Sequence, residues 1–166
     1  MYRIKDFFYK TVYDINGKKL GSVRDIYIDF YKGEVKGLLI GGYSLKAKNN
    51  YIPITEVIDI DDDILVTSSI KGEGLKISEV LGMEVVDRYG SIKGMVEDFL
   101  ISSDSFLIKG IIISAGIIDK LIYGREIILI NKSILGEDYI LYLGDPNVIV
   151  KNIPHEVSKN EYYKKA

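Results

Sequence analysis

The chain has 166 residues, of which 47% are hydrophobic and 28% charged, and its net charge is −2. This balance predicts a soluble protein with packed cores, and the lack of a basic excess disfavours nucleic acid as a partner. No cysteine is present, which excludes disulfides, thiolate metal sites and cysteine nucleophiles. We see neither a signal peptide nor an apolar run of about 20 residues that could cross a membrane, so we expect a cytoplasmic protein.

The chain contains 28 isoleucines but only 3 alanines. Isoleucine is β-branched and favours strands, whereas alanine favours helices. A genome rich in A and T would also raise the isoleucine content, and we expect both causes to operate. The composition therefore favours an all-β fold.

Residues 12–40 and 85–113 are two copies of one pattern, and a constant offset of 73 residues relates them without a gap. The shared positions are Asp14 and Asp87, Gly17 and Gly90, Gly21 and Gly94, Asp25 and Asp98, and Gly37 and Gly110. A repeat of fixed period decides the architecture, and two copies are too few for a solenoid. We predict two small domains in tandem, residues 1–70 and 77–143, followed by a partly ordered tail at residues 144–166.

Each copy begins with a short helical turn, which we expect Asp6 and Ser78 to cap. The dipeptide Asn16–Gly17 then predicts a tight hairpin turn with positive φ. Apolar and polar residues alternate over residues 23–29, as in a strand with one buried face, and a disturbance at Asp25 predicts a bulge. The returning strand, residues 35–40, contains Gly37, which suggests a close backbone approach or a bend.

The first copy continues with a basic loop at residues 41–50 and a strand at residues 51–54. Residues 45–48 with Tyr43 and Tyr51 could form a small patch for an anion or nucleic acid, but we favour a solvated loop, because the overall balance is acidic. A further hairpin has Asp59 and Asp61–Asp63 near its tip. Clustered carboxylates attract divalent cations, but the glycine and distal glutamate of a helix-loop-helix calcium site are missing. We favour a solvated tip and expect no metal site.

The second copy has an apolar loop where the first has its basic loop. Its apolar residues Ile117, Ile118, Leu121 and Ile122 fall on one side of a helical turn, and Tyr123 follows them. One interpretation is a lid over its own barrel or a contact with the other barrel. The other is a surface for a homodimer or a partner protein, because exposed apolar patches mark contacts. These five residues are the candidate interaction surface.

Catalysis finds little support in the sequence. The only histidine, His155, lies in the tail, and nothing positions it against a serine. The segment Gly72–Glu73–Gly74 lacks the lysine and hydroxyl residue of a phosphate loop. We therefore expect no enzyme activity, no catalytic residues and no cofactor.

The spacing Asp-x-x-Gly-x-x-x-Gly-x-Val-x-Asp, followed by Lys36–Gly37–Leu38 and residues 51–54, resembles the PRC-barrel family. The second copy departs from the pattern where Ile128–Leu129–Ile130 replaces Ile-Pro-Ile. The resemblance implies small six-stranded β-barrels, similar to the cytoplasmic domain of the photosynthetic reaction-centre H subunit and the C-terminal domain of a ribosome maturation factor. It also implies a bacterial binding protein without catalytic residues, in which the shared aspartates and glycines maintain the fold.

These considerations together predict a non-enzymatic adaptor of two PRC-type barrels, with a protein partner that the sequence does not name and a link to sporulation. A membrane-surface or small-ligand-binding module is one alternative, by analogy with the reaction-centre subunit. A ribosome or RNA-processing assembly factor is another, by analogy with the maturation factor.

Overall fold

The computed structural model describes residues 1–42, 50–114, 125–144 and 150–152. The candidate interaction surface at residues 117–123, residues 43–49 of the basic loop and His155 lie outside these ranges. Among the described residues, no helix is long and apolar enough to span a membrane.

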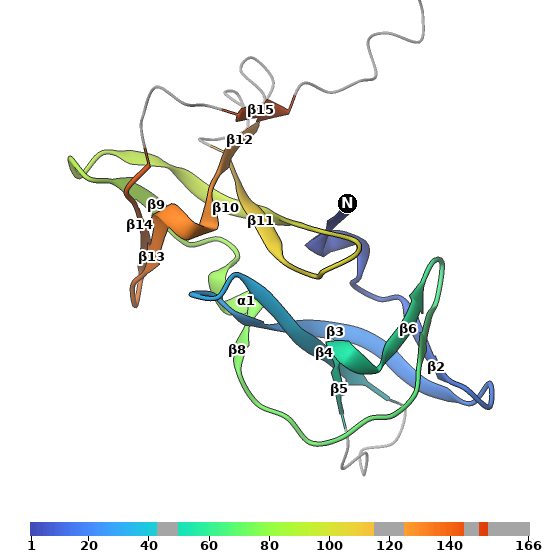
Figure 1. The fold of residues 1–166 in the computed structure, drawn as a ribbon. Helices are drawn as coiled ribbons and strands as arrows, with labels where there is room; N and C mark the ends of the chain where they lie inside the picture. The colour runs from blue at the N-terminus through green and yellow to red at the C-terminus, as the bar shows by residue number, and fades with distance from the viewer. Residues whose placement is uncertain (43–49, 115–124, 145–149, 153–166) are drawn as a thin grey trace, which may run out of the picture.

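The protein is all-β and forms two curled sheets, one for each copy of the repeat (Figure 1). The strands of the first half are β1 (Tyr2–Arg3), β2 (Thr11–Asp14), β3 (Lys19–Asp29), β4 (Glu34–Gly41), β5 (Tyr51–Pro53), β6 (Val57–Ile60) and β7 (Ile64–Val66). The strands of the second half are β8 (Leu75–Lys76), β9 (Glu84–Asp87), β10 (Ile92–Ile101), β11 (Ile108–Ser114), β12 (Arg125–Ile128), β13 (Ser133–Leu135), β14 (Tyr139–Tyr142) and β15 (Val150–Asn152). The helical turns are η1 (Ile4–Asp6), η2 (Ile54–Glu56), α1 (Ile77–Val80) and η3 (Ile130–Lys132).

Six strands of each sheet follow the same order. The first sheet runs β5-β4-β3-β2-β7-β6, and the second runs β12-β11-β10-β9-β14-β13, with β15 added beside β12. Each sheet contains one parallel pair, β2 with β7 and β9 with β14, whereas its other neighbours are antiparallel. The two copies of the sequence thus form two small β-barrels of one topology in tandem, as the resemblance implied.

The alternation predicted for residues 23–29 is interrupted in β3, where Asp25, Ile26, Tyr27 and Ile28 are all buried. Strand β10 alternates except at Asp98 and Phe99. The expected bulge is present and lies just before Asp25. Register shifts occur between Val23 and Asp25 in β3 and between Val96 and Asp98 in β10. A bulge places two residues of one strand opposite one residue of its neighbour and so reverses the alternation. Asp25 is buried together with Ile26 for this reason, rather than pointing to solvent.

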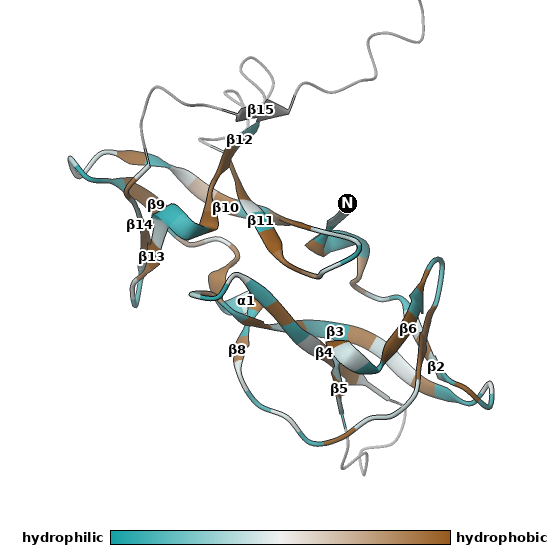
Figure 2. Ribbon diagram, in the orientation of Figure 1, coloured by the Kyte–Doolittle hydropathy of each residue, from teal (hydrophilic) through white to brown (hydrophobic). Residues whose placement is uncertain are grey.

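The core is built mainly from isoleucine, valine and phenylalanine. Strand β11 contributes Ile111, Ile112 and Ile113, and the second half of β12 contributes Ile127 and Ile128, whereas β12 begins with the charged Arg125 and Glu126 (Figure 2). Residues of both sheets and of the helical turns η1, α1 and η3 belong to one continuous buried cluster, which includes Ile4, Phe7, Ile26, Ile77 and Phe99. The two barrels therefore share packing contacts.

The first strand of each half pairs with the sheet of the other half. Strand β1 pairs with β10, with Tyr2 opposite Ile101, while β8 pairs with β3, with Leu75 opposite Ile28. Figure 1 shows the N-terminal segment beside β10 and β11, and α1 and β8 beside β3. Since Tyr2 and Leu75 are 73 residues apart, as are Ile28 and Ile101, the exchange is reciprocal and follows the repeat.

Candidate functional site

The motif residues of the two hairpin turns have the same role in each copy. Asp14 Oδ1 accepts hydrogen bonds from the backbone N–H groups of Asn16 and Lys18, both at 2.9 Å. Asp87 Oδ1 accepts the equivalent bonds from Tyr89 at 2.8 Å and Ser91 at 2.9 Å. The Ser91 bond holds the pKa of Asp87 below its usual value.

Two motif glycines illustrate why the pattern requires this residue type. Gly17 has a φ of +76°, the left-handed conformation predicted for the Asn16–Gly17 turn. Gly37 allows a close approach between strands, because a Cβ there would lie 2.3 Å from the carbonyl oxygen of Ile52. The same Cβ would lie 2.4 Å from the ring of Tyr51. These positions maintain the fold and do not form a cleft.

The shared aspartates of the long strands join the two halves. Asp25 is 7% exposed, and its carboxylate accepts hydrogen bonds from the Ser78 hydroxyl and from the Ser78 N–H at 3.2 Å. It also accepts the N–H of Ile26 at 2.9 Å. Ser78 is the second residue of α1, so a carboxylate from the first barrel satisfies a free N–H at the start of the second repeat.

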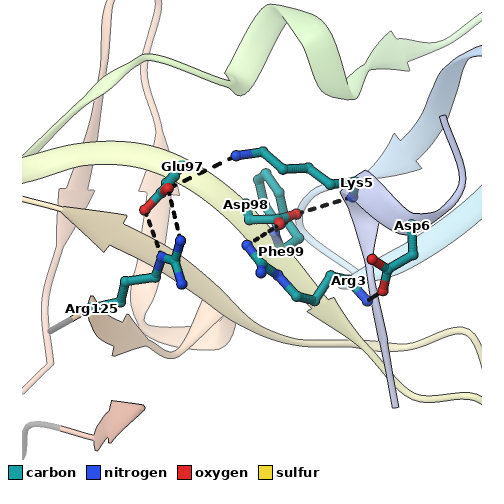
Figure 3. Close-up of polar contacts among 7 residues, drawn as sticks. All are labelled: Arg3, Lys5, Asp6, Glu97, Asp98, Phe99 and Arg125. Carbon is teal, nitrogen blue, oxygen red and sulfur yellow. Dashed lines mark hydrogen bonds and ion pairs between the residues drawn. The ribbon is translucent and has the colours of Figure 1, made fainter. Parts of the chain in front are cut away.

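Asp98 of the second barrel makes the corresponding contacts with the helical turn η1 of the first repeat (Figure 3). Its Oδ1 accepts the Lys5 N–H at 3.3 Å and the Phe99 N–H at 2.8 Å. Its side chain has no exposed surface, and its Oδ2 lies 2.7 Å from Nη2 of Arg3. Each shared aspartate therefore binds the helical turn of the other repeat.

One of the two predicted caps is observed. Asp6 and Ser78 lie within the helical turns, and the N-cap positions are Arg3 and Lys76, neither of which makes a side-chain cap bond. Asp6 is the third residue of η1 and accepts the N–H of the N-cap residue Arg3 at 2.8 Å, so it caps this turn from inside. Ser78 does not cap α1, and Asp25 of the other barrel accepts its N–H instead.

A charged cluster flanks the Asp98 contact. Glu97 forms a two-pronged ion pair with Arg125, with Nε to Oε2 at 2.9 Å and Nη2 to Oε1 at 3.3 Å (Figure 3). The ammonium group of Lys5 lies 4.0 Å from the same carboxylate. Every ionised group named here has an opposite charge beside it, so the cluster is suited to holding elements together.

The outer side of the second sheet presents apolar residues in a row. Ile134 is paired with Leu141, Leu141 with Val86, and Val86 with Ile92, across β13, β14, β9 and β10. Residues directly opposite in a sheet point to the same face. Met95 and Tyr139 lie one row further along, on either side of Glu84. We call Ile134, Leu141, Val86, Ile92, Met95 and Tyr139 the outer apolar face.

The outer apolar face is exposed and has no full counterpart in the first barrel. Its exposed fractions are 65% for Ile92, 51% for Met95, 48% for Tyr139 and 44% for Ile134. The corresponding first-barrel residues, at offsets of 73 and 76, are Ile58, Leu65, Tyr13, Lys19, Ser22 and Asp63. Three of the six positions are therefore polar in the first barrel.

Sequence reasoning did not identify this face. A signal was present, because Ile92, Met95 and Tyr139 stand where the first copy has Lys19, Ser22 and Asp63. The predicted surface formed by Ile117, Ile118, Leu121, Ile122 and Tyr123 lies outside the described residues, so it stays a prediction. The acidic tip at residues 61–63 accepts hydrogen bonds from Lys10 through the backbone oxygens of Asp61 and Asp62.

The comparisons with known proteins agree with the topology. The family model described as PRC-barrel domain matches residues 1–74. The chain is also 32% identical over 73 residues to the probable sporulation protein YlmC of Bacillus subtilis (strain 168), a match that covers 90% of that protein and 40% of this chain. The chain belongs to the PRC-barrel family. Because the second sheet repeats the order of the first, this protein carries two PRC barrels, whereas the Bacillus relative is roughly one repeat long.

Proposed function

We propose that this PRC-barrel protein is a non-enzymatic adaptor that binds a partner protein through the outer apolar face of its second barrel. The observation that carries the proposal is the exposure of four large apolar side chains of one sheet, Ile92 and Met95 on β10, Tyr139 on β14 and Ile134 on β13. Contiguous exposed apolar groups mark contact surfaces more often than scattered ones do. The partner should present a complementary apolar patch.

The difference between the barrels supports a binding role over a purely structural one. Both barrels have the same strand order, so both meet the same structural demands. At equivalent outer positions the first barrel carries Lys19, Ser22 and Asp63, which shows that this topology accepts polar residues there. Apolar residues at these positions of the second barrel are thus not required by the fold.

The name of the Bacillus relative suggests the setting. That relative is a probable sporulation protein, and we extend the association to this chain as part of the proposal. We place the adaptor in the cytoplasm, and we attribute no reaction to it.

The test is a crosslinking pull-down from native lysate with the wild type and two lysine variants. Ile134→Lys changes the outer apolar face, and Ile58→Lys is its control in the first barrel. Ile58 lies 76 residues earlier, is 53% exposed and falls at a register shift between β6 and β7. We expect Ile134→Lys to reduce partner recovery at least about 10-fold, because it buries a charge in an apolar contact. Ile58→Lys should leave recovery unchanged. Growing and sporulating cells should both be sampled.

Four outcomes would contradict the proposal. Loss of the partner with both Ile134→Lys and Ile58→Lys would show that binding does not depend specifically on the second barrel. Recovery of the partner with both variants would show that the outer apolar face is not the binding site. Loss only with a third variant, Leu121→Lys, would place the contact on the predicted loop instead. A turnover that survives purification and disappears on mutation of a polar residue would contradict the non-enzymatic role.

A further inference from the structure

The contact between the two barrels has the form of a twofold interface between identical subunits. Strand β1 lies on β10 and β8 lies on β3, with equivalent residues in each pairing. Asp25 binds Ser78, and Asp98 binds Lys5, which is the equivalent residue 73 positions earlier. In an isologous interface residue i contacts residue j while j contacts i, and the repeats follow this rule.

A bridge on the approximate twofold axis supports the same description. Glu34 and Leu107 are equivalent positions of the two copies, and they face each other as an antiparallel bridge. The bonds run from the Val35 N–H to the Phe106 oxygen at 3.1 Å and from the Ile108 N–H to the Gly33 oxygen at 2.8 Å. A position that pairs with its own equivalent lies on a twofold axis.

None of these contacts requires that both repeats belong to one chain. The only covalent connection is residues 67–74, where Ile70 exchanges two backbone hydrogen bonds with Tyr51, at 3.0 and 2.8 Å. Only four residues, 71–74, then separate Ile70 from the start of β8. The strand pairs β1–β10 and β8–β3 and the bridge between Glu34 and Leu107 all lie outside this segment, so releasing Ile70 from Tyr51 and rerouting the segment breaks none of them.

We propose that a second copy of this chain can take the place of the chain's own second repeat, giving a segment-exchanged dimer. In that dimer the first barrel of each chain binds the second barrel of the other, with the same aspartate, strand and bridge contacts. Intramolecular pairing has an effective concentration in the millimolar range for a short linker. The closed monomer therefore dominates in dilute solution, and the exchanged dimer forms when chains fold together at high concentration.

The test uses two full-length chains with different tags, one carrying Glu34→Cys and the other Leu107→Cys. The wild type has no cysteine, so a disulfide that joins the two differently tagged chains can form only between the cysteines introduced at positions 34 and 107. The hydrogen bonds flank the pair instead of joining it, which brings the two Cβ atoms into a range suited to a disulfide. Both residues are partly exposed and lie outside the shared aspartate contacts, so we expect both variants to fold.

The chains are unfolded together, diluted to refold, and oxidised with glutathione. At ~0.5 mM we expect a disulfide-linked heterodimer, and at ~1 µM we expect almost none. Light scattering on the refolded wild type at the higher concentration should show a species of twice the 18.7 kDa chain mass. Chains carrying Glu84→Cys and Met95→Cys, a pair within the second barrel, control for random collision.

Two results would overturn the proposal. The first combines two observations. A chain that carries both Glu34→Cys and Leu107→Cys forms the disulfide within itself, yet the mixture of the two single variants gives no more heterodimer than the control pair. The second is the absence of a disulfide in the double variant itself, which would show that the two repeats do not meet at the bridge. A heterodimer well above the control supports exchange.

Discussion

Asp98 is the most constrained charged residue among those described. Its side chain is fully buried, and it accepts backbone hydrogen bonds from Lys5 and Phe99 and pairs with Arg3. A buried carboxylate is tolerated only with such partners. Its contacts cross from the second barrel to the first residues of the chain, so one side chain couples two regions far apart in sequence.

Replacing Asp98 with alanine should destabilise the protein by about 2–4 kcal/mol, because two N–H groups lose their acceptor and Arg3 loses its ion-pair partner. Chemical unfolding followed by circular dichroism measures this change. The exposed Asp138→Ala, in the turn before β14, should stay within about 0.5 kcal/mol of the wild type. Equal effects of the two variants would argue against the coupling role of Asp98.

Asp87 gives a prediction about pH. The Ser91 N–H bond is the largest cause that lowers the pKa of this carboxyl in the folded state. A lowered folded pKa stabilises the protein above the unfolded pKa of about 3.9, and this stability is lost as the pH falls through the folded value. The destabilisation caused by Asp87→Asn should therefore be larger at pH 7 than at about pH 2.5. Denaturant titrations at the two pH values measure it, and an effect that grows in acid would contradict the assignment.

At the scale of elements, the close approach of β4 and β5 depends on Gly37. A methyl group at this position would collide with the Ile52 carbonyl oxygen and with the Tyr51 ring. Tyr51 has little freedom to move, since its hydroxyl donates to the Lys36 oxygen at 2.7 Å. Burial raises the pKa of Tyr51, with a smaller contribution from Tyr27, which keeps the hydroxyl protonated as a donor.

We expect Gly37→Ala to destabilise the protein by roughly 2 kcal/mol or more, because the strand pair must separate to admit the methyl group. Gly74→Ala is the control, since its methyl group would meet Tyr27 only at 3.4 Å, an ordinary contact. Thermal unfolding of both variants compares them. A Gly37→Ala protein as stable as the Gly74→Ala protein would show that the strands are not so tightly apposed.

At the scale of the whole molecule, the exchanged segments make the two barrels depend on each other. The buried cluster includes residues from both sheets, and each barrel lends its first strand and helical turn to the other. Unfolding either barrel exposes apolar surface on the other. We therefore expect the two barrels to unfold together as one cooperative unit, although each has its own sheet.

Calorimetry should show one unfolding transition, with a calorimetric enthalpy equal to the van't Hoff enthalpy. In Asp98→Ala, hydrogen exchange should increase in β3 of the first barrel as well as in β10 of the second. Two separate transitions, with only the second shifted by this substitution, would contradict cooperative folding of the barrels.

The sequence by itself determined the repeat, the all-β class and the family. These follow from local patterns: the Asn16–Gly17 turn, the alternation along residues 23–29, and the offset that pairs Asp14 with Asp87. It also contained the polar-to-apolar change between Lys19 and Ile92, although that difference acquires meaning only once pairing places Ile92 beside Val86.

Only the tertiary structure decided which barrel receives each first strand. The residues around Tyr2 and Leu75 have the same apolar pattern and face equivalent partners, Ile101 and Ile28. That pattern is satisfied whether a segment packs on its own barrel or on the other one. The choice depends on the path that the linker at residues 67–74 can follow, a long-range geometric constraint that local propensity does not encode.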